Sequence, residues 1–277
     1  MRKPLTADGY SPELALQARR MCLYVATILG DLIDDLVVVG GLVPYLIIDQ
    51  DAAVQQHVGT RDLDLGFSLA LLDGHRYLEI SARLRDRGFG PGKNRQGNET
   101  RQTWVLPDNR VSIDFLIPQP ADGPAPGKLQ NLESDLAAIV TPALPLAFRD
   151  FIKVTIDDRT PTGELARRTV RVCGPAAFVV MKALALRLRG ENKDAYDLTY
   201  VLLNFGAGPQ DVVDRFRKIE EAPDAKSALA LLAEDFASPD HIGPMRAASF
   251  LNDPPDPARQ ADAFGAVQEF LARVGRS

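Results

Sequence analysis

The sequence predicts an α+β protein in which a mixed β-sheet in the first part of the chain is followed by helices. Apolar, β-branched segments typical of strands occur up to about residue 173, whereas helical periodicity dominates from Pro175 to Val274. We therefore expect a sheet domain with an N-terminal helix over residues 1–173 and a helical domain over residues 174–277. The 277 residues are 45% hydrophobic and 25% charged, which is enough apolar material for this arrangement.

The elements are expected in a definite order. The first helix should begin after Ser11, because serine can cap free amides and Pro12 suits a first turn. The apolar run 36–39 predicts a buried strand that ends at Gly40 and Gly41, ahead of a short helix. Further strands are predicted over 62–67, 102–106, 111–117, 151–156 and 169–172, with a helix over 73–87 that ends at a breaker over 88–91. Later helices are predicted over 175–189, 193–204, 209–219, 224–236 and 257–274.

Composition limits the classes of function. A net charge of −5 argues against a protein that coats nucleic acid through a positive field over its whole surface. Cys22 and Cys173 are far apart and belong to no CxxC or Cys/His group, so we expect buried thiols rather than a zinc site or disulfide. The start of the chain lacks a signal-peptide core, and no apolar run approaches the ~20 residues that span a bilayer. A cytoplasmic protein without membrane contact is expected.

Three aspartates point to a metal site. Asp62 and Asp64 lie in a segment that alternates polar and apolar residues, so they share one face of a strand. Asp114 is the single acid in the otherwise apolar segment 111–117. Because an ionised carboxylate in an apolar strand needs a cation nearby, we expect the three to share a divalent ion, and oxygen ligands favour Mg²⁺. The alternative for the first two is an exposed strand edge, which often carries such a pair.

Other residues are candidates for phosphate binding. Gly40 and Gly41 lack side chains, so their amides can approach an anion just before a helix N-terminus. Thr60 offers a hydroxyl close to Asp62, although a threonine here can equally serve a turn. Lys182 lies in an otherwise apolar helix, which indicates either a cation directed into a site or a side chain that snorkels to solvent.

In this order, the segments resemble the AbiEii-type nucleotidyltransferases, within the polymerase-beta-like nucleotidyltransferase superfamily. That family includes toxins of type IV toxin–antitoxin and abortive-infection systems. The resemblance covers residues 36–204 and rests on the glycine pair after Val39, the segment 59–65, Asp114, and the segment 175–198. It implies a nucleotidyltransferase domain over residues 1–173 and a helical domain that contributes Lys182 to the site.

The resemblance also implies a role for each motif residue. The metal ligands are Asp62, Asp64 and Asp114, the last of which would position or deprotonate the acceptor hydroxyl. The nucleotide contacts are Gly40, Gly41, Thr60, Arg61, Lys182, Asp194 and Asp197. The alternative for the last two is that they cap and salt-bridge two helices. Separately from the resemblance, a cation directed into an apolar surface needs an anion to offset its desolvation, so we expect Asp62 or Asp64 to balance the charge of Lys182 when no substrate is bound. Leu42 departs from the family, where Ser or Thr often follows the glycine pair.

The activity implied is Mg²⁺-dependent transfer of a nucleoside monophosphate from a nucleoside triphosphate to an acceptor hydroxyl. In toxin-type relatives the acceptor is often the 3′ end of tRNA, and an antitoxin protein is a further partner. Arg187, Arg189 and Lys193 are candidate contacts to an RNA backbone, with a solvated helix face as the alternative. Two rival functions share the pattern: an antibiotic-modifying nucleotidyltransferase, and an inactive member that serves as a binding module. A deep acidic pocket would favour cationic drugs, and a broad basic groove would favour RNA.

Overall fold

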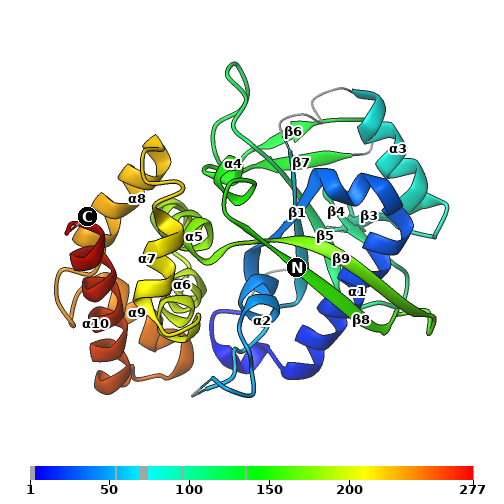
Figure 1. The fold of residues 1–277 in the computed structure, drawn as a ribbon. Coiled ribbons are helices and arrows are strands. Elements are labelled where there is room, and N and C mark those ends of the chain that lie inside the picture. The colour runs from blue at the N-terminus through cyan, green and yellow to red at the C-terminus, as the bar shows by residue number, and fades with distance from the viewer. Residues whose placement is uncertain (1–3, 54, 69–73, 95, 135, 277) are drawn as a thin grey trace.

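A mixed sheet and a group of C-terminal helices lie side by side in the computed structural model (Figure 1). The structure describes residues 4–53, 55–68, 74–94, 96–134 and 136–276. The predicted α+β class with a mixed sheet is confirmed. No helix within these ranges is long and apolar enough to cross a membrane. Cys22 and Cys173 are buried free thiols, as expected.

The described strands form one sheet in the order β3-β4-β5-β2-β1-β9-β8, and β7 pairs with β5 and β6. Three of the pairings are parallel, namely β1 with β9, β2 with β5, and β5 with β7. The strands are β1 Leu36–Val39, β2 Asp62–Phe67, β3 Gly90–Lys93, β4 Glu99–Val105, β5 Ser112–Ile117, β6 Leu129–Asn131, β7 Ala137–Val140, β8 Phe151–Arg159 and β9 Leu165–Cys173.

Helices cover the sheet and build the second part of the molecule. Helix α1 packs against β8 and β9 and begins as predicted, with the amide of Leu14 donating to Ser11 Oγ at 3.4 Å. Helices α5 to α10 form the group beside the sheet (Figure 1). The helices are α1 Pro12–Leu29, α2 Val43–Ile47, α3 Gly74–Arg85, α4 Leu144–Ala147, α5 Pro175–Arg189, α6 Asn192–Asn204, α7 Pro209–Phe216, α8 Pro223–Asp235, α9 Ile242–Leu251 and α10 Pro257–Val274.

Asp150 fixes the start of α5 against the sheet. Its side chain is fully buried, and Oδ2 accepts hydrogen bonds from the amides of Ala176 and Ala177, both at 3.0 Å. Arg215 of α7 lies 2.6 Å from Oδ1 and balances the charge. A carboxylate at the positive end of a helix is stabilising. This joint sets the orientation of α5, and with it the place of Lys182.

Several predicted boundaries were wrong for identifiable reasons. The segment 88–91 was interpreted only as a breaker, but β3 starts at Gly90, because proline is tolerated in the edge strand of a sheet. The short elements β6, β7 and α4, and helix α9, were not predicted. The hairpin of β8 and β9 extends further than predicted because its far end is polar and solvent-facing, with Asp157 opposite Arg167. The predicted start of the 73–87 helix, Asp73, lies outside the described residues.

Candidate metal and phosphate site

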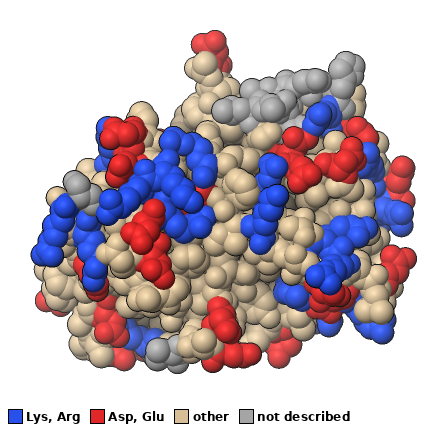
Figure 2. All heavy atoms as spheres, viewed as in Figure 1, with Lys and Arg blue, Asp and Glu red and all other residues tan. Residues whose placement is uncertain are grey.

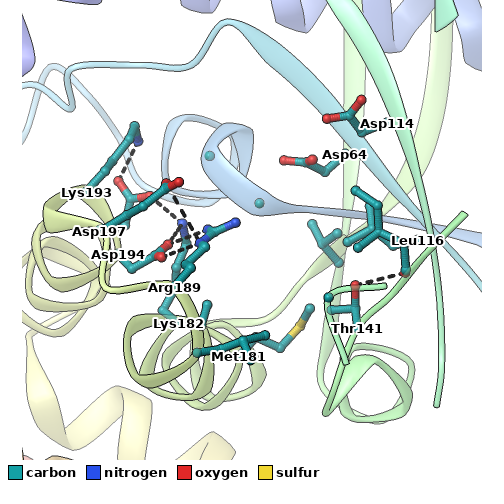
Figure 3. Close-up of a pocket in the computed structure, with 18 of the residues that line it drawn as sticks. Asp64, Asp114, Leu116, Thr141, Met181, Lys182, Arg189, Lys193, Asp194 and Asp197 are labelled. Carbon is teal, nitrogen blue, oxygen red and sulfur yellow. Dashed lines mark hydrogen bonds and ion pairs between the residues drawn. The ribbon is translucent and has the colours of Figure 1, made fainter. Parts of the chain in front are cut away.

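Neighbouring strands bring the three aspartates together. Strands β2 and β5 are parallel, and their register places Asp64 beside Asp114, so both side chains project from one face of the sheet. One oxygen each of Asp62, Asp64 and Asp114 lies within 4.8 Å of the other two. Figure 3 shows Asp64 and Asp114 pointing in the same direction, toward α5 and α6. The predicted convergence of these carboxylates is confirmed.

Two threonines hold these carboxylates. Thr60 Oγ1 donates to Asp62 Oδ1 at 2.6 Å, and Thr103 Oγ1 of β4 donates to Asp114 Oδ1 at the same distance. A hydrogen bond to one carboxylate oxygen fixes the direction of the other oxygen. Residues behind a metal site commonly orient its ligands in this way. Thr60 was predicted to contact a phosphate, and the structure shows it bonded to an aspartate instead. Its phosphate contact remains a prediction.

The glycine pair makes room for the carboxylates. Gly40 has a φ of +69°, and a Cβ atom at this position would lie 1.8 Å from Asp64 Oδ2. A Cβ atom on Gly41 would lie 2.7 Å from Thr60 Oγ1. Backbone conformation and close approach therefore both require glycine after β1. Leu42, which follows the pair directly, is fully buried and packs into the core.

The aspartates face helices α5 and α6 across a cavity of about 580 Å³. This volume lies within the usual range for small-molecule sites. One wall carries the three aspartates with Gly40, Gly41 and Thr60. The opposite wall carries Lys182, Arg189, Lys193, Asp194 and Asp197 (Figure 3). A third, apolar part is lined by Leu116, Ile139, Met181, Ala185 and Leu188.

Lys182 lies in this cavity but is paired differently from the prediction. Its Nζ atom donates to Asp194 Oδ1 at 2.9 Å and to Asp197 Oδ2 at 2.6 Å. The expectation that Asp62 or Asp64 would balance its charge was therefore wrong. The reason is local, because the two α6 aspartates are three residues apart and occupy one face of that helix, toward α5. The side chain of Lys182 is only 9% exposed, so it does not snorkel to solvent.

The two aspartates of α6 join α5 to α6, which is the alternative that the sequence left open for them. Asp194 also accepts two hydrogen bonds from Arg189, both at 2.7 Å, in a bidentate pair. Asp197 also accepts from Lys193 at 2.7 Å and lies 2.9 Å from His57 Nε2. Both carboxylates line the cavity as well, so a contact with nucleotide remains a prediction.

Burial and neighbouring charges set the protonation of this cluster. Burial alone would lower the pKa of Lys182, but Asp194 and Asp197 outweigh it and raise that pKa above its ordinary value. Burial would raise the pKa of Asp197, yet Lys182 and Lys193 bring it well below its usual range. Burial lowers the pKa of His57 to about 4, despite its hydrogen bond to Asp197. At neutral pH the wall therefore presents ionised Lys182 and Asp197 beside a neutral imidazole.

The predicted basic cluster does not form an open basic surface. Arg187 pairs with Glu234 at 2.8 Å and Asp235 at 2.9 Å, while Arg189 and Lys193 bind the aspartates of α6. On the face drawn in Figure 2, Lys and Arg form separate groups interspersed with Asp and Glu. These contacts favour an ion-paired helix face over an open basic groove for an RNA backbone. Arg61, predicted to contact nucleotide, is not among the described residues that line the cavity.

Sequence reasoning missed Thr103 and His57. Thr103 faces Asp114 only through the register of β4 and β5, which no local pattern reveals. The three histidines of the chain are scattered, and Asp197, the partner of His57, lies 140 residues away in the sequence. A comparison with known protein families found no matching family model, and a search of curated proteins found no significant match.

Proposed function

We propose that this protein transfers a nucleoside monophosphate from a nucleoside triphosphate to an acceptor hydroxyl, with Mg²⁺ as cofactor. The observation that carries the proposal is the pairing of walls in one cavity: three converging carboxylates opposite Lys182 and Arg189. A metal–triphosphate complex needs both, because carboxylates bind the metal and cations offset the remaining phosphate charge. The resemblance to AbiEii-type nucleotidyltransferases in the same segments supports this activity.

The donor set fits a hard divalent cation. Carboxylate oxygens within 4.8 Å of one another can share an ion, and Asp64 is only 9% exposed, so a counter-charge there lowers the cost of burial. These ligands suit several hard cations, and we propose Mg²⁺ because it combines few carboxylates with water and substrate phosphates. When bound, the ion would neutralise charge on the phosphate oxygens and orient the donor.

The residues of the chain supply the remaining steps. Asp62 and Asp64 hold the donor side, and Asp114 orients the acceptor hydroxyl or accepts its proton. The hydroxyl oxygen forms a bond to the α-phosphorus, and pyrophosphate leaves. A lysine ammonium has three donors, and the bonds of Lys182 to α6 account for two, which leaves capacity for a phosphate oxygen. The amides of Gly40 and Gly41 offer a second phosphate contact.

The acceptor class is proposed from the resemblance. It implies an RNA 3′ end, that of tRNA in toxin-type proteins, and an antitoxin as partner. One feature favours a second candidate acceptor, a cationic antibiotic. The described residues that line the whole cavity also include Glu191, so acidic side chains outnumber basic ones in the lining. Both acceptors use the same donor site, so one experiment can compare them.

The test follows the label of the nucleotide. The protein is incubated with Mg²⁺ and each nucleoside triphosphate, labelled at the α- or the γ-phosphate, with tRNA, total RNA or an aminoglycoside as acceptor. The proposal predicts acceptor labelling from the α-phosphate alone, and its loss in Asp64→Asn but not in the control Asp157→Asn, an exposed carboxylate on β8. Labelling from the γ-phosphate would instead show phosphoryl transfer. If Asp64→Asn labels the acceptor as well as the parent protein does, the proposed site does not carry out the reaction.

A further inference from the structure

His57 is buried between the segment that leads into β2 and helix α6. It lies in the segment that leads into β2, is 3% exposed, and approaches Asp197 Oδ1 through Nε2 at 2.9 Å. The amide of Gly59 donates to the other ring nitrogen, Nδ1, at 3.1 Å. Because Nδ1 accepts this hydrogen bond, it carries no proton, and Nε2 must be the donor to the carboxylate. The two bonds therefore select one neutral tautomer.

Two aromatic rings of α6 pack against the imidazole ring. It stacks on Tyr196 with ring centroids 5.3 Å apart and meets Tyr200 edge-on at 4.9 Å. The amide of His57 donates to Gln50 Oε1 at 2.9 Å, and the amide of Val58 donates to the Tyr196 hydroxyl at 3.2 Å. The segment before β2 is thus attached to α6 through both side chain and backbone.

A continuous line of bonds joins the cationic wall to the metal-binding wall. Lys182 donates to Asp197, which accepts from His57, whose ring holds the amide of Gly59. The next residue, Thr60, donates to Asp62. Gly59 has a φ of +89°, so the chain bends sharply between the imidazole and the threonine. The position of the Thr60 hydroxyl, and of the carboxylate it holds, depends on this bend.

We propose that His57 is a positioning residue, which holds the segment 57–60 against α6 so that the carboxylate of Asp62 is preoriented for a divalent cation. The inference rests on the metal site of the proposed function and adds a residue that touches neither metal nor nucleotide. A histidine suits this place because one small ring both accepts from a backbone amide and donates to a buried carboxylate. Residues behind metal ligands commonly affect affinity in this way.

Two substitutions separate the bonds of the ring. His57→Phe keeps an aromatic ring against Tyr196 and Tyr200 but loses both hydrogen bonds. His57→Asn loses the bond to Asp197 but keeps an oxygen that can accept from an amide two residues later, as asparagine does in turns. Mn²⁺ binding is measured by the electron paramagnetic resonance of the free ion, and thermal melting is recorded for each variant.

The expected result is about tenfold weaker Mn²⁺ binding for His57→Phe, and affinity closer to the parent for His57→Asn. His241→Phe, on a histidine at the start of α9, should bind Mn²⁺ like the parent. If His57→Phe does not fold, Tyr196→Phe removes the hydroxyl that holds Val58 and should also weaken binding.

Each other outcome has a defined meaning. Parental Mn²⁺ affinity in folded His57→Phe would overturn the positioning role. Equal weakening in His57→Phe and His57→Asn would support it and assign the effect to the bond with Asp197, which both variants lose. If His57→Phe does not fold, parental affinity in both His57→Asn and Tyr196→Phe would overturn it. Asp64→Asn separates this inference from the proposed function. If Asp64→Asn binds Mn²⁺ like the parent, the proposed metal site is wrong. If Asp64→Asn loses Mn²⁺ binding while the His57 variants keep parental affinity, the metal site stands and only the role of His57 is rejected.

Discussion

Replacement of Lys182 by methionine tests the buried ion network between α5 and α6. Methionine keeps an unbranched side chain of similar length but removes the ammonium that bonds to Asp194 and Asp197 at 2.9 and 2.6 Å. Removing one partner of a buried ion pair costs about 3–5 kcal/mol. Each aspartate keeps another cation, Arg189 or Lys193, so we expect the lower end, about 3 kcal/mol. The same substitution should greatly reduce nucleotide transfer.

The measurement is the free energy of unfolding in urea, monitored by circular dichroism. The slope of this free energy against urea concentration should be the same for parent and variant. Arg187→Met is the matched control on the same helix, because Arg187 is 44% exposed and also pairs with acids. Its free energy of unfolding should be nearly unchanged, since solvent screens exposed pairs. If Lys182→Met destabilises no more than Arg187→Met, the network contributes little to folding.

Three further predictions concern the walls of the cavity. Gly40→Ala should lower the free energy of unfolding by at least about 1 kcal/mol and weaken Mn²⁺ binding, because its φ is +69° and the new Cβ would lie 1.8 Å from Asp64 Oδ2; parental Mn²⁺ affinity would contradict this. Thr103→Val should weaken Mn²⁺ binding by about tenfold, since Asp114 loses its 2.6 Å hydrogen bond, and unchanged binding isotherms would refute the role of the hydroxyl. Stability should fall as the pH drops from 6.5 to about 4, because the unfolded histidine takes up a proton before buried His57 does. The free energy of unfolding should fall by about 3 kcal/mol across this window and should not change through His57 above it. If urea titrations of His57→Phe show the same dependence of this free energy on pH, His57 is not the cause.

The sequence predicted the elements of the site better than their contacts. Alternation in 62–67 correctly placed Asp62 and Asp64 on one face, because period two is a local property of a strand. The single acid in 111–117 correctly marked Asp114 as a companion. That β5 lies beside β2, with Asp114 next to Asp64, depends on long-range pairing and register, which local patterns do not contain.

The partners of Lys182 illustrate the same limit. The sequence indicated an inward-directed lysine and offered Asp194 and Asp197 as helix-bridging acids, but it did not join the two observations. The rotation of α6 against α5 decides that they meet, and this rotation follows from packing of the whole helical part. His57 was beyond prediction for the same reason, because the fold alone brings it to Asp197.

Crystals soaked in Mn²⁺ with a non-hydrolysable nucleoside triphosphate would show whether the three aspartates bind a metal, since anomalous scattering locates the ion without reference to activity. We expect a Mn²⁺ peak bound by oxygens of Asp62, Asp64 and Asp114, with the triphosphate extending toward Lys182. The peak should vanish in Asp64→Asn. A metal bound elsewhere, or a triphosphate that lies outside this cavity, would show that the three aspartates and Lys182 do not form the proposed site.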